Sequence, residues 1–548
     1  MPFYRLRILL SEFWAARRRA FFVRGFFGIL LLVGLLCYRD YGVSWDEEVL
    51  RTNAMVSAKY VANMVAPAWT ARQPKFANVR AIEGNRDNDH GVLFELPVVV
   101  LAKALGVDDS RTYYLLRHLA VFLVFMGGVW ALYRLGSAYL RSWRWGLLVS
   151  FWLVLSPRFF AESFYNGTDI VFLALFTLGV YTLTRLLRRP SLGRAVVHGL
   201  ATAAAVDVRI LGVLLVAFTI GLVGLEAGVG PCERPRRWAL VRALALYLVV
   251  MMGAVVAGWP YLWAAPASHF AAVLLHLSRY TAWDGPMLYL GHVISALRLP
   301  WHYAPVWIFI TTPLAYTGAF VLGAGGVLVA LLRHPIARLR TFEGRLDVLI
   351  LGWFGLPILL VIGLESVIYD GWRHLYFVYP ALLLLAGRGA QLLWHAGRQG
   401  QLWHRVAVVA VMMAGLEMAY TTARMVRAHP QEQVYFSFLP PGTAEQLFEC
   451  DYWGLSYRQG LEWIARHDPA PVLAVAAPNN GLIEKNLALV RRPDRFRFRL
   501  VNAAQARYFL SAYRTHPAPY PDSIGREVYR VQAYGLRVLS VFRRPGRR

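Results

Sequence analysis

The amino-acid sequence predicts a polytopic α-helical membrane protein with a small α/β domain at its C-terminal end. Hydrophobic residues make up 57% of the 548 positions and charged residues only 16%, whereas a soluble domain usually carries about 25% charged residues. Apolar runs close to the ~20 residues that a membrane-spanning helix needs recur between residues 21 and 421. After residue 421 the sequence is polar, is interrupted by prolines and contains no such run.

We expect about eleven transmembrane helices. The fifth and sixth apolar runs are separated only by a short stretch containing Asp207 and Arg209, so these two runs could instead form a re-entrant pair or a single helix. The predicted spans are residues 21–38, 117–139, 145–161, 170–187, 195–208, 210–227, 243–260, 304–332, 347–365, 376–394 and 405–421.

The net charge of +26 comes mostly from arginine. An arginine excess in a soluble protein suggests a nucleic-acid partner, but the cytoplasmic loops of membrane proteins are also enriched in basic residues. If the N-terminus is cytoplasmic, the short arginine clusters all fall in inner loops, at residues 141–144, 185–194, 234–242, 333–345 and 398–405. The sequence therefore predicts a cytoplasmic N-terminus, an extracytoplasmic C-terminal domain and no nucleic-acid partner.

The first apolar run, Phe21 to Cys37, follows a basic segment, and no small-residue cleavage pattern comes after it. We interpret this run as a retained signal anchor. The remaining cysteines, Cys232 and Cys450, lie far away in the sequence. Their spacing is typical neither of a metal site nor of a disulfide framework.

A long outer loop, roughly residues 39–116, follows the first span and begins with the acidic run Asp46-Glu47-Glu48. Because charge near hydrocarbon is costly, an acidic cluster at a membrane boundary is a candidate functional site. The alternative is a solvated loop that merely ends a helix. Later in the same loop, Val92–Leu105 is too short and too charged to span comfortably, and we predict an interfacial helix there.

Residues 422–548 are predicted to form a separate extracytoplasmic domain after a transmembrane module of residues 1–421. A length of about 120 residues is enough for a core of its own. Hydrophobic periodicity predicts one amphipathic helix and four strands, of which the last two form a hairpin around Gly535. The helix is Ser456–His467, and the strands are Pro471–Ala477, Phe496–Val501, Glu527–Ala533 and Leu536–Arg543.

Further ionisable side chains gather at the predicted outer ends of the spans. A carboxylate can deprotonate a hydroxyl group, and a guanidinium group donates to phosphate oxygens in a bidentate fashion. Acidic and basic groups at one membrane face therefore suggest transfer from a phosphate-linked donor. Besides the first-loop carboxylates, the group comprises Glu162, Asp169, Asp207, Arg209, Glu365, Asp370, Arg373 and His374.

Several of these side chains also have a structural interpretation. Asp169 could cap the helix that continues at Ile170. Arg209 could pair with Asp207, since charges within membranes commonly pair with one another. His374 alone would be structural, but its place in the run Trp372–Tyr376, beside Glu365 and Asp370, favours a functional interpretation.

At four places the sequence resembles the GT-C superfamily of polyprenyl-phosphate-sugar-dependent glycosyltransferases, in particular the bacterial relatives of protein O-mannosyltransferases and of aminoarabinose lipid A transferases. A further stretch, residues 429–457, is similar to the start of the outer domain in bacterial members. At position 209 relatives often have lysine, and arginine keeps that charge while adding a bidentate fork. The four places are Asp46-Glu47, Asp169, Val208-Arg209-Ile210 and the run Arg373–Pro380.

The resemblance implies an inverting glycosyltransferase of a bacterial inner membrane with a periplasmic active site. In this scheme Asp46 accepts the proton of an acceptor hydroxyl that attacks the anomeric carbon. Glu47 or Asp169 orients the acceptor or the base. Because fixed cations hold the phosphate, we expect neither a metal ion nor a cofactor. The lipid phosphate leaves toward three basic side chains, Arg209, Arg373 and His374.

The resemblance leaves the substrates open. Tyr376, Asp370 and Glu365 are candidate substrate-binding residues. The expected partners are a polyprenyl-phosphate sugar, membrane lipids and an acceptor that is a lipid, a protein or a glycan. A transporter or flippase of a lipid-linked saccharide is the alternative function, and an O-antigen ligase or polymerase is a further one.

Overall fold

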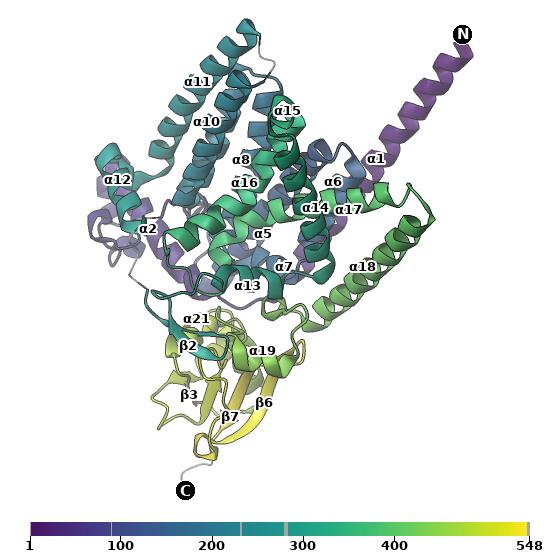
Figure 1. Ribbon diagram of the computed structural model, residues 1–548. Coiled ribbons are helices and arrows are strands. Elements are labelled where there is room, and N and C mark those ends of the chain that lie inside the picture. The colour runs from purple at the N-terminus through teal and green to yellow at the C-terminus, as the bar shows by residue number, and fades with distance from the viewer. Residues whose placement is uncertain (1, 89, 231–232, 279–282, 545–548) are drawn as a thin grey trace.

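The computed structural model describes residues 2–88, 90–230, 233–278 and 283–544, with the backbone alone for residues 2–16. A large helical bundle is followed by a small mixed domain at one end, and α15 (Pro335–Arg340) lies at the opposite end of the bundle (Figure 1). The fold class predicted from the sequence, a multi-pass helical protein with a C-terminal α/β domain, is confirmed.

Within the described residues, nine helices are long and apolar enough to cross a membrane. Two of them include a short 3-10 turn at their start. They are Arg17–Cys37 of α1 (Pro2–Cys37), α5 (Ser110–Tyr139), α8 (Asp169–Arg188), Ile210–Gly228 with η3 (Ile210–Gly212) and α10 (Val213–Gly228), α11 (Arg234–Gly258), α14 (Leu314–Arg333), α16 (Phe342–Gly363), Arg373–Ala396 with η5 (Arg373–Val378) and α17 (Tyr379–Ala396), and α18 (Gln401–Ala428).

Two predicted spans differ from single long helices. The third is a pair, α6 (Trp143–Val154) and α7 (Pro157–Tyr165), bent by 71°. Pro157 stands in the first turn of α7, where its missing N–H group costs nothing and its ring ends the preceding helix. The fifth, α9 (Leu192–Val208), has only 17 residues. Counting the bent pair as one span gives up to ten among the described residues, against the eleven expected.

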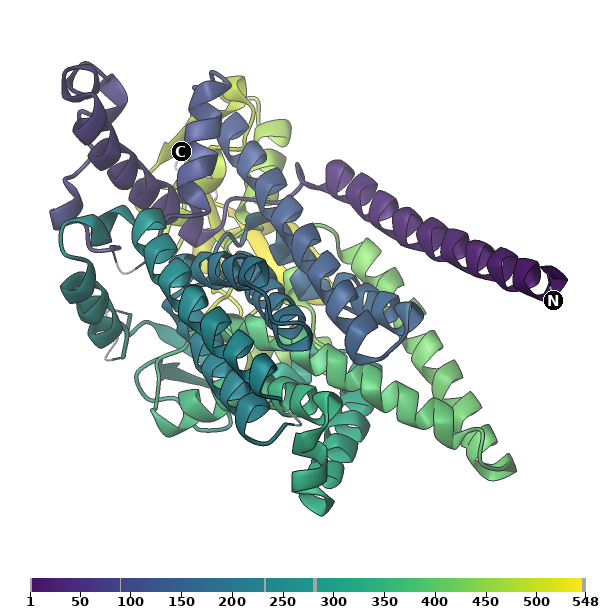
Figure 2. The same ribbon diagram turned by 90° about the horizontal axis from the view of Figure 1, so that it is seen from above.

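The predicted span at residues 304–332 is also divided. A short helix, α13 (Tyr303–Thr311), precedes α14, and Pro313 lies between them. α1 and α18 lie at the edge of the bundle, as the view from above shows (Figure 2). Only 11% of the most apolar window of each is buried, so most of their surface is left for lipid.

The first outer loop contains more helix than the sequence pattern predicts. The expected interfacial helix is present as α4 (Glu95–Ala104), and it packs against α2 (Trp45–Val65), which we did not predict. α2 starts directly at the acidic run, where Glu47 accepts a hydrogen bond of 2.6 Å from the Ser44 N–H. Three short elements follow α2, namely α3 (Pro67–Ala71), η1 (Pro74–Phe76) and η2 (Ile82–Gly84).

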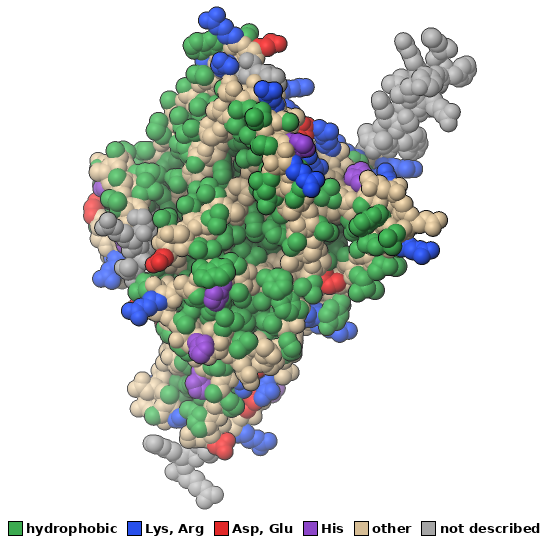
Figure 3. All heavy atoms as spheres, in the orientation of Figure 1, with side chains coloured by type: hydrophobic (Ala, Val, Ile, Leu, Met, Phe, Trp, Pro, Cys, Tyr) green, Lys and Arg blue, Asp and Glu red, His purple; other side chains and the backbone are tan. Residues whose placement is uncertain are grey.

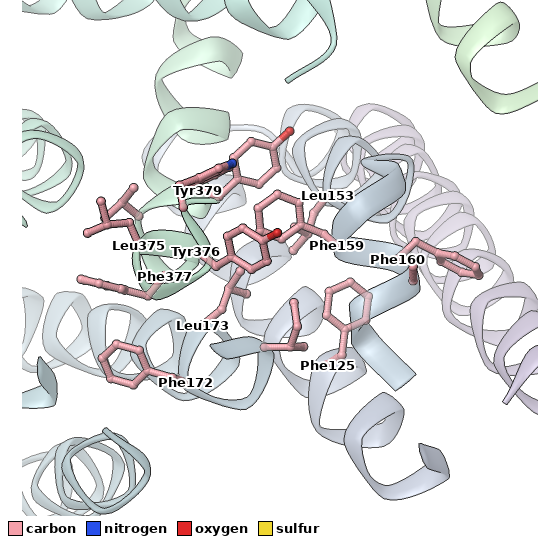
Figure 4. Packing of buried hydrophobic residues seen from close by; sticks show 14 of the residues in the cluster. Phe125, Leu153, Phe159, Phe160, Phe172, Leu173, Leu375, Tyr376, Phe377 and Tyr379 are labelled. Carbon is pink, nitrogen blue, oxygen red and sulfur yellow. The ribbon is translucent and has the colours of Figure 1, made fainter. Parts of the chain in front are cut away.

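The core of the bundle is aromatic and lies directly beneath the outer ends of its helices. Phe159 of α7 stacks on Tyr379 of α17 with ring centroids 4.1 Å apart (Figure 4). Phe172 of α8 contacts Phe377 of η5 at 4.9 Å. This packing fixes the first turns of α8 and η5 relative to one another, and both turns carry candidate site residues.

A connecting segment between α11 and α13 reaches toward the C-terminal domain. It contains η4 (Pro260–Trp263), α12 (Pro266–Ser278) and an antiparallel hairpin of β1 (Pro286–Tyr289) and β2 (His292–Ser295). Tyr289 forms an isolated bridge with Phe448. The hairpin is thereby tied to the C-terminal domain.

The C-terminal domain has a five-stranded mixed sheet with the order β4-β3-β5-β7-β6. The predicted helix, the predicted strands and the hairpin are confirmed, while β5 in the centre of the sheet was missed. α18 continues past residue 421 to Ala428. The elements are η6 (Glu432–Val434), α19 (Pro441–Leu447), α20 (Tyr457–His467), β3 (Leu473–Ala476), α21 (Asn480–Leu487), α22 (Arg492–Arg495), β4 (Phe498–Leu500), β5 (Tyr508–Ser511), η7 (Asp522–Ile524), β6 (Arg526–Ala533) and β7 (Leu536–Arg543).

Hydrophobic side chains cover the middle of the molecule, and Lys and Arg side chains gather at the end away from the C-terminal domain (Figure 3). This distribution is the one that a multi-pass membrane protein needs.

Candidate active site

Arg373 joins three carboxylates that come from distant parts of the chain. Its Nη1 lies 2.8 Å from Oδ2 of Asp46 and 3.3 Å from Oδ2 of Asp169. Its Nη2 lies 3.3 Å from Oδ2 of Asp370. Asp46 stands in the first turn of α2, Asp169 in the first turn of α8, and Arg373 opens η5. Four of the residues singled out in the sequence, Asp46, Asp169, Asp370 and Arg373, therefore meet at one point.

Arg209 completes this cluster from the other side. It forms an ion pair with Oδ1 of Asp169, so that Asp169 bridges Arg209 and Arg373. The alternative pairing of Arg209 with Asp207 does not occur. Instead, the buried carboxylate of Asp207 lies against Gly258, where any Cβ atom would collide with it.

The capping role considered for Asp169 is filled by another side chain. Asn166 accepts a hydrogen bond of 2.8 Å from the Asp169 N–H and donates one of 3.0 Å to its carboxylate. Asp169 is thus left to neutralise the two arginines. Its position in the first turn of α8 also places its charge at the positive end of the helix dipole.

The members of the cluster differ in their access to solvent. The side chain of Asp46 is 28% exposed and that of Arg209 is 12% exposed, whereas Arg373 and Asp169 are 2% and 1% exposed. Asp46 is therefore the carboxylate around Arg373 that is most open to an incoming group. The Arg373 guanidinium is held between the rings of Tyr369 and Trp453, at 4.9 and 4.7 Å from their centroids.

Glu47 points away from Asp46 into a second buried cluster. Its carboxylate accepts from Arg117 at 2.9 Å and contacts His118 at 3.0 Å. Burial alone would raise the pKa of Glu47, but the charges of His118 and Arg117 outweigh burial and lower it. Arg117 also pairs with Glu95 of α4. Glu47 thus fixes the start of α2 against α5 and α4.

The C-terminal domain contributes to the site through Arg514, which the sequence did not single out. Arg514 pairs with Asp370, and its Nε lies 3.4 Å from Oε2 of Glu449. Burial raises the pKa of Glu449 to about 7, although Arg514 counteracts it. Arg514 is one of many arginines in a polar tail, so no sequence pattern could have marked it.

The remaining predicted residues lie around the cluster. Tyr376 donates a hydrogen bond of 2.8 Å to Glu162, which also accepts from Tyr452 at 3.2 Å. His374 packs edge-on against Tyr369 at 4.6 Å. Glu365 lies at an exposed turn with φ 49°, and among the described residues its carboxylate bonds to no member of the cluster. The structure therefore brings together all of the predicted site residues except Glu47, Asp207 and Glu365.

The C-terminal domain also holds the segment that leads into Asp46. The Val43 N–H donates to Oδ1 of Asn486 at 3.1 Å, and Asn486 Nδ2 donates to the Val43 carbonyl at 3.3 Å. A Cβ atom on Gly42 would lie 2.5 Å from both Asn486 Oδ1 and the Leu455 carbonyl, so only glycine fits there. Lys485 of the same helix pairs with Glu48 at 2.5 Å.

Among the described residues, Cys37, Asp40 and His429 form a group whose potential metal-binding atoms lie within 4.8 Å of one another. Both ring nitrogens of His429 are already engaged, Nε2 by Asp40 at 3.0 Å and Nδ1 by Glu432 at 2.7 Å. Burial would lower the pKa of His429, but these two carboxylates raise it to about 9. With both ring nitrogens engaged by carboxylates, the group forms an ion-pair cluster.

No protein-family model matches this sequence. No curated protein matches it either. Among solved structures, the chain is similar to ArnT from Cupriavidus metallidurans in the apo state, with 13% identity, a TM-score of 0.47, and coverage of 95% of this chain and 98% of that chain.

The same protein bound to undecaprenyl phosphate is similar at 14% identity and a TM-score of 0.46, over 94% of this chain and 98% of that chain. An Archaeoglobus fulgidus oligosaccharyltransferase, tethered to an acceptor peptide by a disulfide bond, is similar at 11% identity and a TM-score of 0.42, over 76% of this chain and 56% of that chain.

Proposed function

We propose that this protein is a membrane glycosyltransferase that transfers a sugar from a polyprenyl-phosphate donor to an acceptor hydroxyl at the extracytoplasmic face of a bacterial inner membrane. The observation that carries the proposal is the Asp46–Arg373–Asp169–Arg209 cluster, in which an open carboxylate lies beside two buried or nearly buried cations. The donor class is the one that the motif resemblance implies.

The open carboxylate suits the role of general base. In a single displacement the acceptor oxygen attacks the anomeric carbon as the bond between that carbon and the phosphate oxygen breaks. The hydroxyl proton passes to Asp46, which is 28% exposed, and the sugar inverts its configuration. The polyprenyl phosphate leaves with the electron pair of the broken bond and with its negative charge.

The two arginines suit the role of holding the leaving phosphate. Nε of Arg209 and Nε of Arg373 are buried, and among the described residues they have no hydrogen-bond partner. A buried donor without an acceptor costs about 1–3 kcal/mol. Phosphate oxygens bound at these two N–H groups would remove that cost without breaking the ion pairs that fix the arginines. His374 lies next to Arg373 in the same turn and is proposed to contribute to the phosphate site.

The other predicted residues fit supporting roles. Asp169 positions both arginines, and Glu47 positions the helix that carries Asp46. The hydroxyl of Tyr376 is bound to Glu162, and Asp370 is bound to Arg373 and Arg514. We therefore propose that Tyr376 and Asp370 form the wall of the site. No step in this scheme requires a metal ion or a cofactor.

The test is transfer by purified Asp46→Asn protein from a radiolabelled polyprenyl-phosphate sugar to membranes of a strain lacking the protein. We expect the rate to fall by about 10²–10⁴-fold, because the proton acceptor is lost. Glu48→Gln is the matched control, since Glu48 is the exposed neighbouring carboxylate paired with Lys485. An Asp46→Asn protein that works at the rate of the wild type would contradict the proposed base. A wild-type protein that moves the intact lipid across vesicles without cleaving it would favour the flippase.

A further inference from the structure

A pocket lined by five arginines lies at the end of the bundle away from the C-terminal domain. Its volume is about 280 Å³. α5, the end of α8, and the turn into α9 with the first residues of that helix supply the basic side chains. We call it the arginine pocket, and its basic residues are Arg134, Arg185, Arg188, Arg189 and Arg194.

The arginine pocket and the candidate active site lie at opposite ends of one helix. α8 begins at Asp169 and ends at Arg188. At 1.5 Å per residue these two positions are about 28 Å apart along the helix axis. This separation is close to the ~30 Å thickness of the hydrocarbon core of a bilayer. The arginine pocket therefore opens at the membrane face opposite to Asp46.

The protein leaves most of the positive charge of the pocket without a paired carboxylate, although Glu343 interacts electrostatically with Arg188. Among the described residues, none of its five arginines forms an ion pair with a carboxylate. Nearby carboxylates are used elsewhere: Glu343 pairs with Arg141, and Glu226 pairs with Arg236 and Arg345. The C-terminal dipole of α8 contributes only about half of a negative charge. The pocket thus has several cationic groups that a negative ligand could neutralise.

Aromatic rings hold these guanidinium groups in place. Tyr181 lies between Arg134 and Arg185, each 5.8 Å from the centroid of its ring. Arg188 lies 5.2 Å from the centroid of Phe342. Cation–π contacts of this kind restrain side chains that would otherwise be mobile. A general excess of basic residues on one face requires neither convergence into a pocket nor such stacking.

We propose that the arginine pocket binds the phosphate headgroup of an anionic phospholipid in the leaflet on that side. Guanidinium groups match phosphate oxygens in geometry and charge, and basic pockets between membrane helices are suited to lipid headgroups. The rest of the lining includes the half-buried Ala138 and the buried Leu135 and Leu346. A volume of about 280 Å³ is enough for a phosphate headgroup. The proposal is independent of the transferase activity.

The experiment compares two triple variants of the full-length protein in detergent by native mass spectrometry with added cardiolipin, phosphatidylglycerol or phosphatidylcholine. The pocket variant carries Arg134→Gln, Arg185→Gln and Arg188→Gln. The control variant carries Arg242→Gln, Arg333→Gln and Arg340→Gln, which remove the same charge from exposed positions outside the pocket. Size-exclusion profiles and melting curves check that both variants fold.

We expect the wild type and the control variant to bind the two anionic lipids with affinities within about twofold of each other. The pocket variant should bind them about 100-fold more weakly, since each of the three arginines near the headgroup contributes about fivefold. Equal losses in both triple variants would show that general surface charge is responsible and would overturn the proposal. If the pocket variant does not fold, the single Arg188→Gln variant replaces it, with about a fivefold loss expected.

A second arm distinguishes a lipid headgroup from free phosphate. Sodium pyrophosphate is added to the protein in lipid-free detergent, and no binding is expected at millimolar concentration, because the apolar part of the ligand is absent. Pyrophosphate binding that is tight in the wild type and lost in the pocket variant, together with no preference for anionic lipids, would identify a soluble phosphate ligand and overturn the lipid assignment.

Discussion

Arg373 carries a positive charge that three carboxylates share, and only Asp46 among them has substantial access to solvent. Asp169 is the opposite case, because it is buried and each of its oxygens faces a different arginine. The two aspartates therefore have different physical roles although they contact the same guanidinium. Asp46 is open to a substrate, whereas Asp169 holds the cations where they are.

Asp169→Asn separates these roles. The amide cannot neutralise Arg209 and Arg373, and the loss of one partner from a buried ion pair costs about 3–5 kcal/mol. We expect a clearly lower melting temperature in detergent and loss of transfer. Asp46→Asn should lose transfer but keep a melting temperature close to that of the wild type, since Arg373 retains Asp169 and Asp370. Equal destabilisation by the two substitutions would argue against this division of roles.

His429 gives a prediction about pH. Its pKa is raised from 6.5 to about 9 by Glu432 and Asp40, which overcome the effect of burial. A raised histidine pKa contributes stability that is fully present below about 6.5 and is lost as the pH rises through about 9. The contribution is at most about 3 kcal/mol. Between pH 6 and pH 10 the melting temperature should therefore fall more steeply for the wild type than for His429→Gln.

The control for this comparison is His467→Gln, because His467 is an exposed histidine at the end of α20. Its curve should follow that of the wild type. Parallel curves for the wild type and His429→Gln would show that His429 is not protonated in the folded protein.

At the scale of elements, the important contact is between α21 and the segment that precedes α2. Asn486 accepts a hydrogen bond from the Val43 N–H and donates one to the Val43 carbonyl. It also donates to the Gly454 carbonyl at 3.0 Å. The start of α2 is fixed on its other side by Glu47, Arg117 and His118. Asp46 is thus positioned jointly by the helical bundle and by the C-terminal domain. The domain therefore lies over the end of the bundle and also helps to set the position of a candidate site residue.

Asn486→Ala tests this positioning. The substitution removes the hydrogen bonds to Val43 and leaves the cluster itself intact. We expect turnover to fall by about ten- to a hundredfold, since a displacement of about 1 Å at a catalytic group has effects of this size. The KM for the donor should change little, because the arginines do not move.

Asn480→Ala is the matched control. Asn480 lies in the same helix, but its side chain bonds only within the C-terminal domain, to the Val501 carbonyl and the Ala477 N–H. If Asn480→Ala lowered turnover as much as Asn486→Ala, the effect would come from the stability of the domain and not from the position of Asp46.

At the scale of the whole molecule, the two ends of the bundle differ in charge and in what they carry. The candidate active site and the C-terminal domain lie at one end, and the arginine pocket and α15 lie at the other (Figure 1). The distribution of arginine predicts that the arginine-rich end is cytoplasmic. The orientation can be measured directly.

A membrane-impermeant maleimide should label Arg466→Cys in intact cells and Arg340→Cys only after lysis, in a background where the three native cysteines are replaced by serine. Arg466 is exposed on α20 of the C-terminal domain, and Arg340 is exposed at the end of α15. Labelling of Arg466→Cys only after lysis would reverse the predicted topology.

The sequence by itself determined the class of fold and the end at which the charged side chains gather. Long apolar runs become helices wherever the backbone must satisfy its own hydrogen bonds in lipid, and arginine clusters mark one face. Both are local properties, so Asp46, Asp169, Arg209 and Arg373 could be proposed from their places at helix ends. The bend at Pro157 and the start of α2 were harder to predict from the sequence, because local propensity competes there with packing.

Only the tertiary structure decided which charges meet. Residues 46, 169, 209 and 373 come together because α2, α8, α9 and η5 begin or end at the same level of the bundle. Glu47, next to Asp46 in the sequence, points the other way, because successive residues of a helix face different directions. Arg514, which pairs with Asp370, and Asn486, which holds Val43, both lie more than a hundred residues beyond Arg373 in the sequence. Contacts between segments so far apart depend on how the whole chain packs, and no local pattern encodes them.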